Sequence, residues 1–170
     1  MDIKILSARP EQMKKKPTDE SNLGFGDIVT DHMFLMDFQE GKGWGNPRIE
    51  PYHSLAIDPA AMVLHYGQEV FEGLKAYRGK DGGLYLFRAR DNLLRLNRSA
   101  LRLCMPEVDV DLGMEALTKL VLLDKDWIPR SQGTSLYIRP TMIATEPHLG
   151  VRPAKAYLFY IIIGPVGAYY

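Results

Sequence analysis

The sequence predicts an α+β fold, a largely antiparallel sheet flanked by helices. Three observations support this prediction: strand-like patterns near the beginning of the chain, two amphipathic helical patterns in the middle, and strand-like patterns again at the end. Strands that alternate regularly with helices would indicate parallel βαβ units, and the order of elements here differs from that. With 170 residues, 46% of them hydrophobic, the chain is about one domain long and can bury a core.

The first strand-like pattern covers residues 27–38, which are rich in β-branched and large apolar side chains. Glycine, asparagine and proline then cluster in residues 41–47, so we expect a glycine-rich loop there. A weaker strand is predicted for residues 49–57. It ends at Asp58, because a residue that precedes proline avoids helical backbone angles.

Residues 60–72 contain helix-forming residues at helical spacing, but Gly67 and Gly73 limit a helix there to about two turns. Two short apolar runs at 74–78 and 84–87 flank a turn made of glycine, lysine and aspartate. Such runs around a glycine-rich turn predict a β-hairpin.

Two amphipathic helices are predicted next, at about 91–105 with Asp91 as the N-cap and at about 112–127. Proline follows each helix and favours its end at that point. Residues 134–144 and 155–163 then return to strand-like patterns, which completes the order of elements of the α+β prediction.

Composition excludes several classes of function. The chain has 21 basic and 21 acidic residues, so its net charge is +0 and binding to nucleic acid is disfavoured. A single cysteine, Cys104, rules out an internal disulfide and a multi-thiolate metal site, and its apolar helical position favours burial. The longest apolar run, residues 156–163, is too short for a membrane helix, and a targeting segment is not evident. We therefore expect a cytoplasmic protein without a membrane anchor.

The domain organisation is read from changes in composition. Residues 1–24 are polar, and we expect an N-terminal extension that crosses the surface as a tether. Residues 25–164 form the predicted α+β domain. Residues 165–170 combine turn residues with two aromatic residues, and we interpret them as the start of an interdomain linker whose second domain is absent from this chain.

Arginines concentrate in the first predicted helix. Arg95, Arg98 and Arg102 follow one another at spacings that place them on one helix face. Arginine binds phosphate and carboxylate groups through its fork of N–H donors, so this face is a candidate anion site. The alternative is a solvated face that carries surface ion pairs.

Tyr137 and Arg139 are two residues apart in a predicted strand, so their side chains project from the same face of the sheet. A phenol beside a guanidinium group is a candidate carboxylate site. The alternative is a strand face turned toward solvent.

Other catalytic signals are weak. The four histidines, His32, His53, His65 and His148, have no metal-ligand spacing and are interpreted as structural. No phosphate-binding loop or nucleophile motif is recognised either. From the residues alone, the chain is an anion-binding domain without a recognised base, nucleophile or metal.

Several segments together, in order and with fitting spacing, resemble one known family. They are Phe25-Gly26, Thr30 to Met33, His65 to Tyr77 (HYGQEVFEGLKAY), Ser135 to Pro140 (SLYIRP), Ala144 to Pro147 (ATEP), Leu149 to Val151 and Gly164 to Gly167 (GPVG). From about residue 24 onward the chain resembles the smaller N-terminal domain of the branched-chain amino acid aminotransferases. These are pyridoxal-phosphate enzymes of fold type IV.

The resemblance implies roles for the matching positions. It assigns Arg95 to the cofactor phosphate, and Arg139, beside Tyr137, to the distal carboxylate of glutamate. It also places Leu149 and Val151 on a loop that, like Tyr66, completes the active site of a neighbouring subunit, and so implies a homodimer. The residues implied to wall the pocket for the branched side chain are Phe25, Tyr66, Phe71, Tyr137 and Tyr169.

The implied reaction transfers the amino group of Leu, Ile or Val to 2-oxoglutarate through pyridoxal 5′-phosphate. The family's Schiff-base lysine belongs to the second domain, so no catalytic residue is expected in this chain, which alone should be inactive and hold no covalent cofactor. Lys75 matches a structural position. Two alternatives remain: a stand-alone, non-catalytic module that binds anions or amino acids, and another fold-type IV member such as a D-amino acid aminotransferase or an aminodeoxychorismate lyase.

Overall fold

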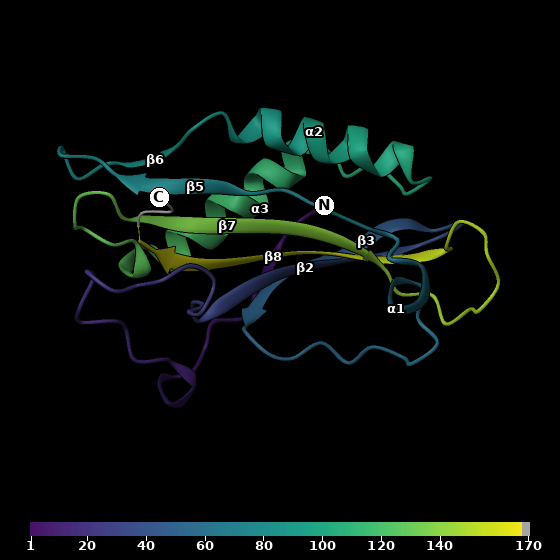
Figure 1. The fold of residues 1–170 in the computed structure, drawn as a ribbon, viewed down its shortest axis with the longest axis horizontal. Coiled ribbons are helices and arrows are strands. Elements are labelled where there is room, and N and C mark those ends of the chain that lie inside the picture. The colour runs from purple at the N-terminus through teal and green to yellow at the C-terminus, as the bar shows by residue number, and fades with distance from the viewer. Residues whose placement is uncertain (168–170) are drawn as a thin grey trace.

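A strongly twisted sheet forms the centre of the computed structural model, which describes residues 1–167 (Figure 1). The strands are β1 (Lys4–Ile5), β2 (His32–Gln39), β3 (Gly43–Pro51), β4 (Glu69–Phe71), β5 (Leu74–Arg78), β6 (Leu84–Leu86), β7 (Ser135–Ala144) and β8 (Ala156–Val166). Their order across the sheet is β1-β3-β2-β8-β7-β5-β6, and β4 also pairs with β7. Every pairing among the described strands is antiparallel except β1 with β3. The predicted α+β class with a largely antiparallel sheet is confirmed.

The longer helices, α2 (Ala89–Arg102) and α3 (Val110–Leu123), lie against one face of this sheet, and the short helix α1 (Met62–Tyr66) lies at one end of it (Figure 1). Single 3-10 turns occupy Pro10–Gln12 and Lys125–Trp127. Asp109 caps α3 by accepting hydrogen bonds from the N–H groups of Asp111 at 2.8 Å and Leu112 at 2.9 Å. Helix α3 therefore starts two residues earlier than the apolar periodicity predicted.

The prediction that Asp91 caps α2 is wrong. The helix begins at Ala89, directly after Arg88, which has left-handed backbone angles with φ of 52°. Asp91 instead lies in the first turn, where its carboxylate accepts a hydrogen bond from Arg88 Nε at 2.5 Å. A negative charge in the first turn is favourable beside the exposed N–H groups of the helix, so the acidic residue stabilises this helix end without capping it.

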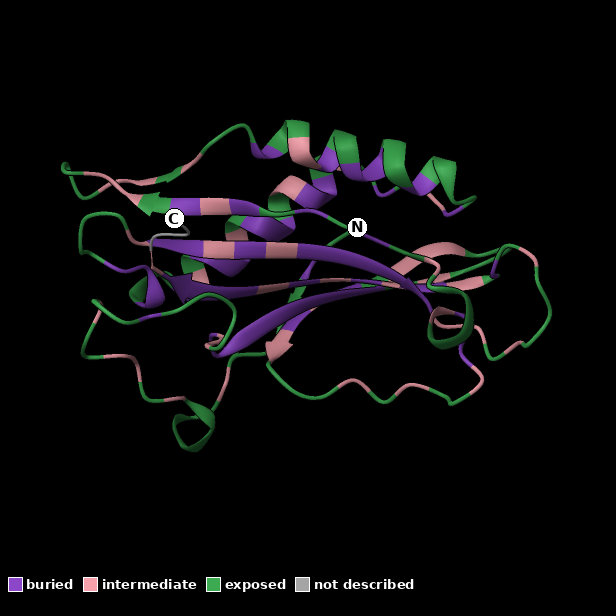
Figure 2. Cartoon of the chain, viewed as in Figure 1, coloured by how far each residue is buried: buried purple, intermediate pink, exposed green. Residues whose placement is uncertain are grey.

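The core lies between the helices and the sheet face that they cover, and Figure 2 shows the buried residues concentrated along the central strands and the inner helix faces. Its largest fully buried side chains include Phe34, Phe159, Leu93, Leu96, Leu117, Leu120 and Leu136. Burying each such side chain stabilises the fold by about 1.5–3 kcal/mol. The buried faces of α2 and α3 carry the predicted apolar stripes, but Cys104, which was expected to be buried in the first helix, is exposed and lies beyond the end of α2.

Two predicted boundaries were wrong because tertiary pairing overrides local propensity. Strand β3 begins within the expected glycine-rich loop and ends at Pro51, so residues 52–57 are not strand. Its register against β2 shifts between Leu35 and Asp37, where β3 supplies one extra residue and Asn46 takes φ of 54°. This is a β-bulge, which accommodates residues that a regular strand disfavours. The helix predicted within residues 60–72 is shorter than expected, because α1 ends at Tyr66 with Gly67 as its C-cap. Residues 69–71, which were expected to be helical, instead pair with β7 as strand β4.

The N-terminal segment, expected to be a tether, crosses the surface but is anchored along its length. Ile3 and Leu23 are buried, and β1 adds a parallel edge to β3. The amide of Ala8 donates to His32 Nε2 at 2.8 Å, and Lys14 Nζ donates to the Thr30 carbonyl at 2.7 Å. At the other end, Pro165 and Val166 continue strand β8 beyond the expected domain boundary.

None of the helices described between residues 1 and 167 is long and apolar enough to span a bilayer. Over the same residues, no three His, Cys, Asp or Glu side chains are grouped so that they could hold a metal ion.

Candidate functional site

Tyr137 and Arg139 project together from the sheet face opposite the helices, as their spacing in β7 predicts. The Arg139 guanidinium group donates to Tyr137 Oη at 2.8 Å from Nη2 and at 3.2 Å from Nε. It also lies over the Phe71 ring, 4.4 Å from the centroid. The rings of Phe25 and Tyr137 are 4.8 Å apart. The structure thus groups four of the residues that the sequence selected, which we call the Tyr137–Arg139 cluster: Phe25, Phe71, Tyr137 and Arg139.

A cavity of about 190 Å³ lies beside this cluster. Its walls include Phe25, Ile28, Tyr137, Arg139, Ile162 and Gly164. Most of these walls are apolar, and one guanidinium group and one phenol enter from β7. Small-molecule sites typically combine apolar walls with a few directed polar groups, and this cavity has that character.

Between the Tyr137–Arg139 cluster and helix α2, the row of strands that pairs with β7 is interrupted. Both β4 and β5 pair with β7, and Glu72 and Gly73 lie between them. Pro140 of β7 faces this break: it has no N–H to donate, and its carbonyl accepts the Glu72 amide at 2.9 Å. The Phe71 ring contacts Arg139 on the open face of the sheet, the face opposite the helices. The Glu72 side chain instead reaches α2 on the face that the helices cover.

Gly73, the second residue between β4 and β5, contacts Tyr137. A Cβ atom at Gly73 would lie 2.5 Å from Tyr137 Oη, so the phenol packs directly against the glycine backbone. Neither Glu72 nor Gly73 was predicted from the sequence to belong to the site. The available signal was an acidic residue between Phe71 and Gly73 in an otherwise apolar run, but only the structure shows which groups it meets.

Arg95, the candidate phosphate ligand, forms a two-point ion pair with Glu72. Its Nε lies 2.5 Å from Oε1 and its Nη2 lies 2.7 Å from Oε2. Asn92 Nδ2 also donates to Glu72 Oε2 at 3.0 Å. Only 5% of the Glu72 side chain is exposed, whereas 61% of the Arg95 side chain is. Burial alone raises the pKa of the Glu72 carboxyl, but the hydrogen bonds from Arg95 and Asn92 and the Arg95 charge outweigh burial and hold this pKa below its ordinary value.

The predicted arginine face of α2 divides into two parts. Arg95 and Arg98, together with Arg88 and Phe87, border a shallow hollow of about 330 Å³. Arg102 instead borders a separate groove that contains Tyr66 and Val151. The anion-binding interpretation is therefore confined to Arg95 and Arg98, in the middle of α2.

The other site residues named by the sequence lie elsewhere. The Tyr66 hydroxyl donates to the Leu149 carbonyl, and Leu149 and Val151 are 63% and 87% exposed. None of these three residues lines the cavity beside Tyr137. Tyr169 is outside the residues that the structure describes.

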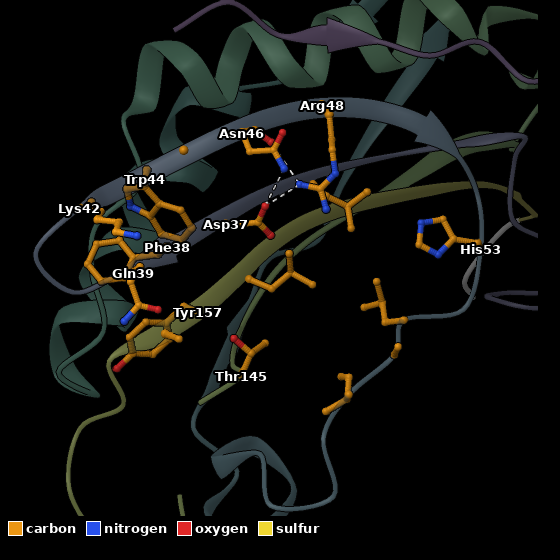
Figure 3. Close-up of a pocket in the computed structure, with 18 residues that line it drawn as sticks. Asp37, Phe38, Gln39, Lys42, Trp44, Asn46, Arg48, His53, Thr145 and Tyr157 are labelled. Atoms are coloured by element: carbon orange, nitrogen blue, oxygen red, sulfur yellow. Dashed lines mark hydrogen bonds and ion pairs between the residues drawn. The ribbon is translucent and has the colours of Figure 1, made fainter. Parts of the chain in front are cut away.

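A larger hollow of about 610 Å³ lies on the same open face, over β2, β3 and β8. Asp37 accepts hydrogen bonds from Arg48 Nη1 at 2.8 Å and Asn46 Nδ2 at 2.9 Å, and Phe38, Trp44 and Tyr157 gather at its other end (Figure 3). A hydrogen bond with the Glu50 carboxylate raises the pKa of His53, which lies at the border of this hollow. None of the site residues named by the sequence lines this hollow.

The Glu72–Arg95 pair predicts a pH-dependent effect of an Arg95→Gln substitution. A carboxyl group whose pKa is lowered by folding contributes stability above its unfolded pKa, and this contribution is lost as the pH falls through the folded pKa. We expect Arg95→Gln to destabilise the protein at about pH 7 and by less at about pH 3.5, where the contribution of the pair has begun to fall because the pH is below the ordinary glutamate value. Urea unfolding at both pH values measures this difference. Arg98→Gln is the matched control, since no ion pair of Arg98 is found among residues 1–167. An equal effect of Arg95→Gln at both pH values would contradict the assignment.

Comparison with solved structures shows the class of protein to which this fold belongs. The chain matches an Escherichia coli branched-chain amino acid aminotransferase with a TM-score of 0.58 and 25% identity, covering 81% of this chain and 40% of that one. It matches a T.th. branched-chain amino acid aminotransferase, solved with pyridoxamine 5′-phosphate, with a TM-score of 0.59 and 26% identity, covering 79% and 40%. The fold is that of the N-terminal domain of the fold-type IV aminotransferases.

Sequence comparison is more specific. The chain is 59% identical over 157 residues to branched-chain-amino-acid transaminase 1 of Bacillus subtilis, covering 92% of this chain and 44% of the relative. It is 47% identical over 161 residues to the mitochondrial enzyme of Bos taurus, covering 94% and 41%. No family model matches the chain. The chain is therefore a relative of the branched-chain-amino-acid aminotransferases in sequence and in fold, and it spans less than half the length of these relatives.

Proposed function

We propose that this chain forms the substrate-pocket part of a branched-chain amino acid aminotransferase, which transfers the amino group of Leu, Ile or Val to 2-oxoglutarate with pyridoxal 5′-phosphate. The observation that carries the proposal is the Tyr137–Arg139 cluster beside an apolar cavity. Apolar walls suit the side chain of a branched aliphatic amino acid. The guanidinium group of Arg139 suits the distal carboxylate of glutamate or 2-oxoglutarate. One cavity could thus receive both substrates in turn.

The polar contacts of Arg139 support this dual use. Tyr137 accepts two of its N–H groups, and the Phe71 ring covers one face of the guanidinium plane. These contacts hold the positive charge at the edge of the cavity, where an apolar side chain can bypass it. A carboxylate could then bind the remaining N–H donors without requiring the arginine to change its position.

The exposed residues of α2 fit a phosphate group. Arg95 keeps N–H donors that Glu72 does not use, and Arg98 adds a second positive charge at the same hollow. Pyridoxal phosphate would supply the electron sink that transamination requires. In this proposal the chain contributes pocket walls and one phosphate ligand, while the lysine that links the cofactor belongs to a second domain. The chain alone is then inactive and holds no cofactor covalently.

Homodimerisation is part of the proposal. Tyr66, Leu149 and Val151 lie together at the surface, apart from the Tyr137–Arg139 cluster. A loop that exposes Leu149 and Val151 to this extent is suited to contact another subunit. The proposal assigns these residues to the pocket of that subunit. It also places the protein in the cytoplasm, as its single cysteine favours.

The test uses the complete reading frame that contains these residues. We expect the frame to continue past Tyr170 into a domain with a suitable lysine, and its product to transfer amino groups from L-leucine, L-isoleucine and L-valine to 2-oxoglutarate. The isolated chain should show no activity. A stop codon directly after Tyr170, or a product that accepts D-alanine but not L-leucine, would overturn the proposal in favour of a binding module or a D-amino acid aminotransferase respectively.

Substituting Arg139 should separate the two substrates. In the complete protein, we expect Arg139→Gln to raise the KM for 2-oxoglutarate by about 30-fold, since a hydrogen bond to a charged group contributes roughly 1.5–3 kcal/mol. The KM for L-leucine should change less than about threefold, because an apolar side chain gains nothing from the guanidinium charge. Steady-state kinetics with each substrate varied in turn measures both values. Lys75→Gln, a change at a neighbouring position of β5, is the control. Equal losses for both substrates would contradict this role of Arg139.

A further inference from the structure

We propose that Glu72 is a positioning residue that orients Arg95 toward the phosphate of the cofactor. The inference rests on the proposed function and adds a residue to which neither the sequence analysis nor the comparisons assign a role. It follows from which edge of the Arg95 guanidinium group is already occupied.

The guanidinium group of arginine carries five N–H donors in a planar fork. Glu72 binds one side of this fork, since its two carboxylate oxygens accept from Nε and Nη2 of Arg95. Both N–H groups of Nη1 and the second N–H of Nη2 remain, and one N–H of each of these two nitrogens points along the end of the group. Two parallel hydrogen bonds from this end match two oxygens of a phosphate. Glu72 thus occupies the side of the fork and leaves the end free for an anion.

Glu72 is itself rigidly held, which an orienting residue requires. Its amide donates to Pro140 in the break between β4 and β5, and its side chain is 5% exposed. Asn92, one turn before Arg95 on α2, donates to the same carboxylate at 3.0 Å and approaches the Gly73 carbonyl at 3.4 Å. A long, mostly exposed arginine side chain loses conformational entropy when it binds a ligand. A fixed carboxylate that has already ordered Arg95 reduces that cost, which is the basis of preorganisation.

The charge balance of the hollow allows an anion to bind there despite Glu72. The Glu72 carboxylate neutralises part of the Arg95 charge, and Asp91 pairs with Arg88. Arg98 borders the same hollow, and no ion pair of its side chain is found in the described part of the chain. The hollow therefore keeps a net positive charge.

The experiment compares two ligands that differ only in the phosphate. Cofactor-free complete protein is titrated with pyridoxal 5′-phosphate and with pyridoxal, for the wild type, Glu72→Gln, Arg95→Gln and the double variant. We expect Glu72→Gln to lower the affinity for the phosphorylated ligand about tenfold, by analogy with the lower end of the loss seen when residues that orient metal ligands are changed. Affinity for pyridoxal should change less than about twofold, and the double variant should bind no more weakly than Arg95→Gln, because Glu72 acts through Arg95.

Arg90→Gln is the matched control, since Arg90 of α2 pairs with Asp111 of α3 and does not border the hollow, so this change should leave both affinities unchanged. If Glu72→Gln lowers the affinity for both ligands equally, the role of Glu72 is merely structural and the proposal is overturned. Unchanged affinity in Glu72→Gln, or additive losses in the double variant, would overturn it as well. If the wild type transaminates but Arg95→Gln binds both ligands normally, the positioning role fails while the proposed function stands. If the wild type neither transaminates nor prefers the phosphorylated ligand, both fail.

Discussion

Replacing Gly164 by alanine is expected to detach residues 28–30 from strand β8 and to destabilise the protein by about 3 kcal/mol or more, at the upper end of the range for overpacking. A Cβ atom at Gly164 would lie 2.0 Å from the carbonyl oxygen of Ile28. The obstructing atom belongs to the backbone, so no side-chain rotation relieves the clash. The contact is fixed nearby, because the Thr30 amide donates to the Ile163 carbonyl at 2.9 Å.

The substitution should also alter the candidate pocket, because Ile28 and Gly164 both line the cavity beside Tyr137. Urea unfolding measures the stability, and hydrogen exchange at the Thr30 amide reports the detachment. Gly167→Ala is the matched control on the same segment, since its nearest neighbour would be 3.9 Å from the new Cβ. We expect that variant to lie within about 0.5 kcal/mol of the wild type. A stable Gly164→Ala variant with a protected Thr30 amide would show that the two segments do not pack as closely as described.

The second large effect is expected for Asp124→Ala. Asp124 follows helix α3 and is 3% exposed. Its carboxylate accepts the His32 amide at 3.1 Å and the His32 ring Nδ1 at 2.6 Å. Because His32 Nε2 accepts the amide of Ala8, Nδ1 is the ring nitrogen that donates. Alanine leaves both donors of His32 buried without a partner, which costs about 2–5 kcal/mol.

This loss should extend to the N-terminal segment. The hydrogen bonds from Ala8 to His32 and from His32 to Asp124 connect that segment to the end of α3. Faster hydrogen exchange at Ala8 should therefore accompany a lower free energy of unfolding in denaturant. Asp126→Ala is the control, since Asp126 is exposed in the following 3-10 turn. A loss below about 1 kcal/mol would contradict the burial cost assigned to this pair.

Elements whose stability depends on local pattern were predictable. Helices α2 and α3 carry apolar stripes at helical spacing, and the β5–β6 hairpin has apolar runs on both sides of a glycine-rich turn. Their boundaries were less predictable because they depend on backbone details. The start of α2 uses Arg88 in a left-handed conformation, which an acidic residue nearby does not reveal.

Elements that depend on a partner were missed. Strand β4 consists of the last residues of a helix-like pattern, and it is a strand because β7 offers it a ladder. The glycine-rich start of β3 is a strand for the same reason, with β2 as its partner. In both cases hydrogen bonds to a distant segment outweigh local propensity, which is a weak preference.

In the candidate site too, features set by local pattern were predictable and features set by distant partners were not. The period of two along β7 predicted that Tyr137 and Arg139 share a face, and helical spacing predicted an arginine-rich face on α2. The family resemblance added Phe25 and Phe71. It did not indicate that Glu72 would bind Arg95.

The sequence by itself determined the α+β class, the resemblance to the branched-chain aminotransferases and three of the residues that line the pocket, Phe25, Tyr137 and Arg139, because periodicity and local motifs are properties of neighbouring residues. Only the tertiary structure decided that Phe71, Glu72 and Gly73 serve three different contacts, with Arg139, Arg95 and Tyr137 respectively. The physical reason is that these contacts depend on pairing with a distant strand, β7, in which Pro140 has no N–H to donate. Pro140 lies opposite the break between β4 and β5, about 70 residues away along the chain, and no local pattern records which segment will pair there.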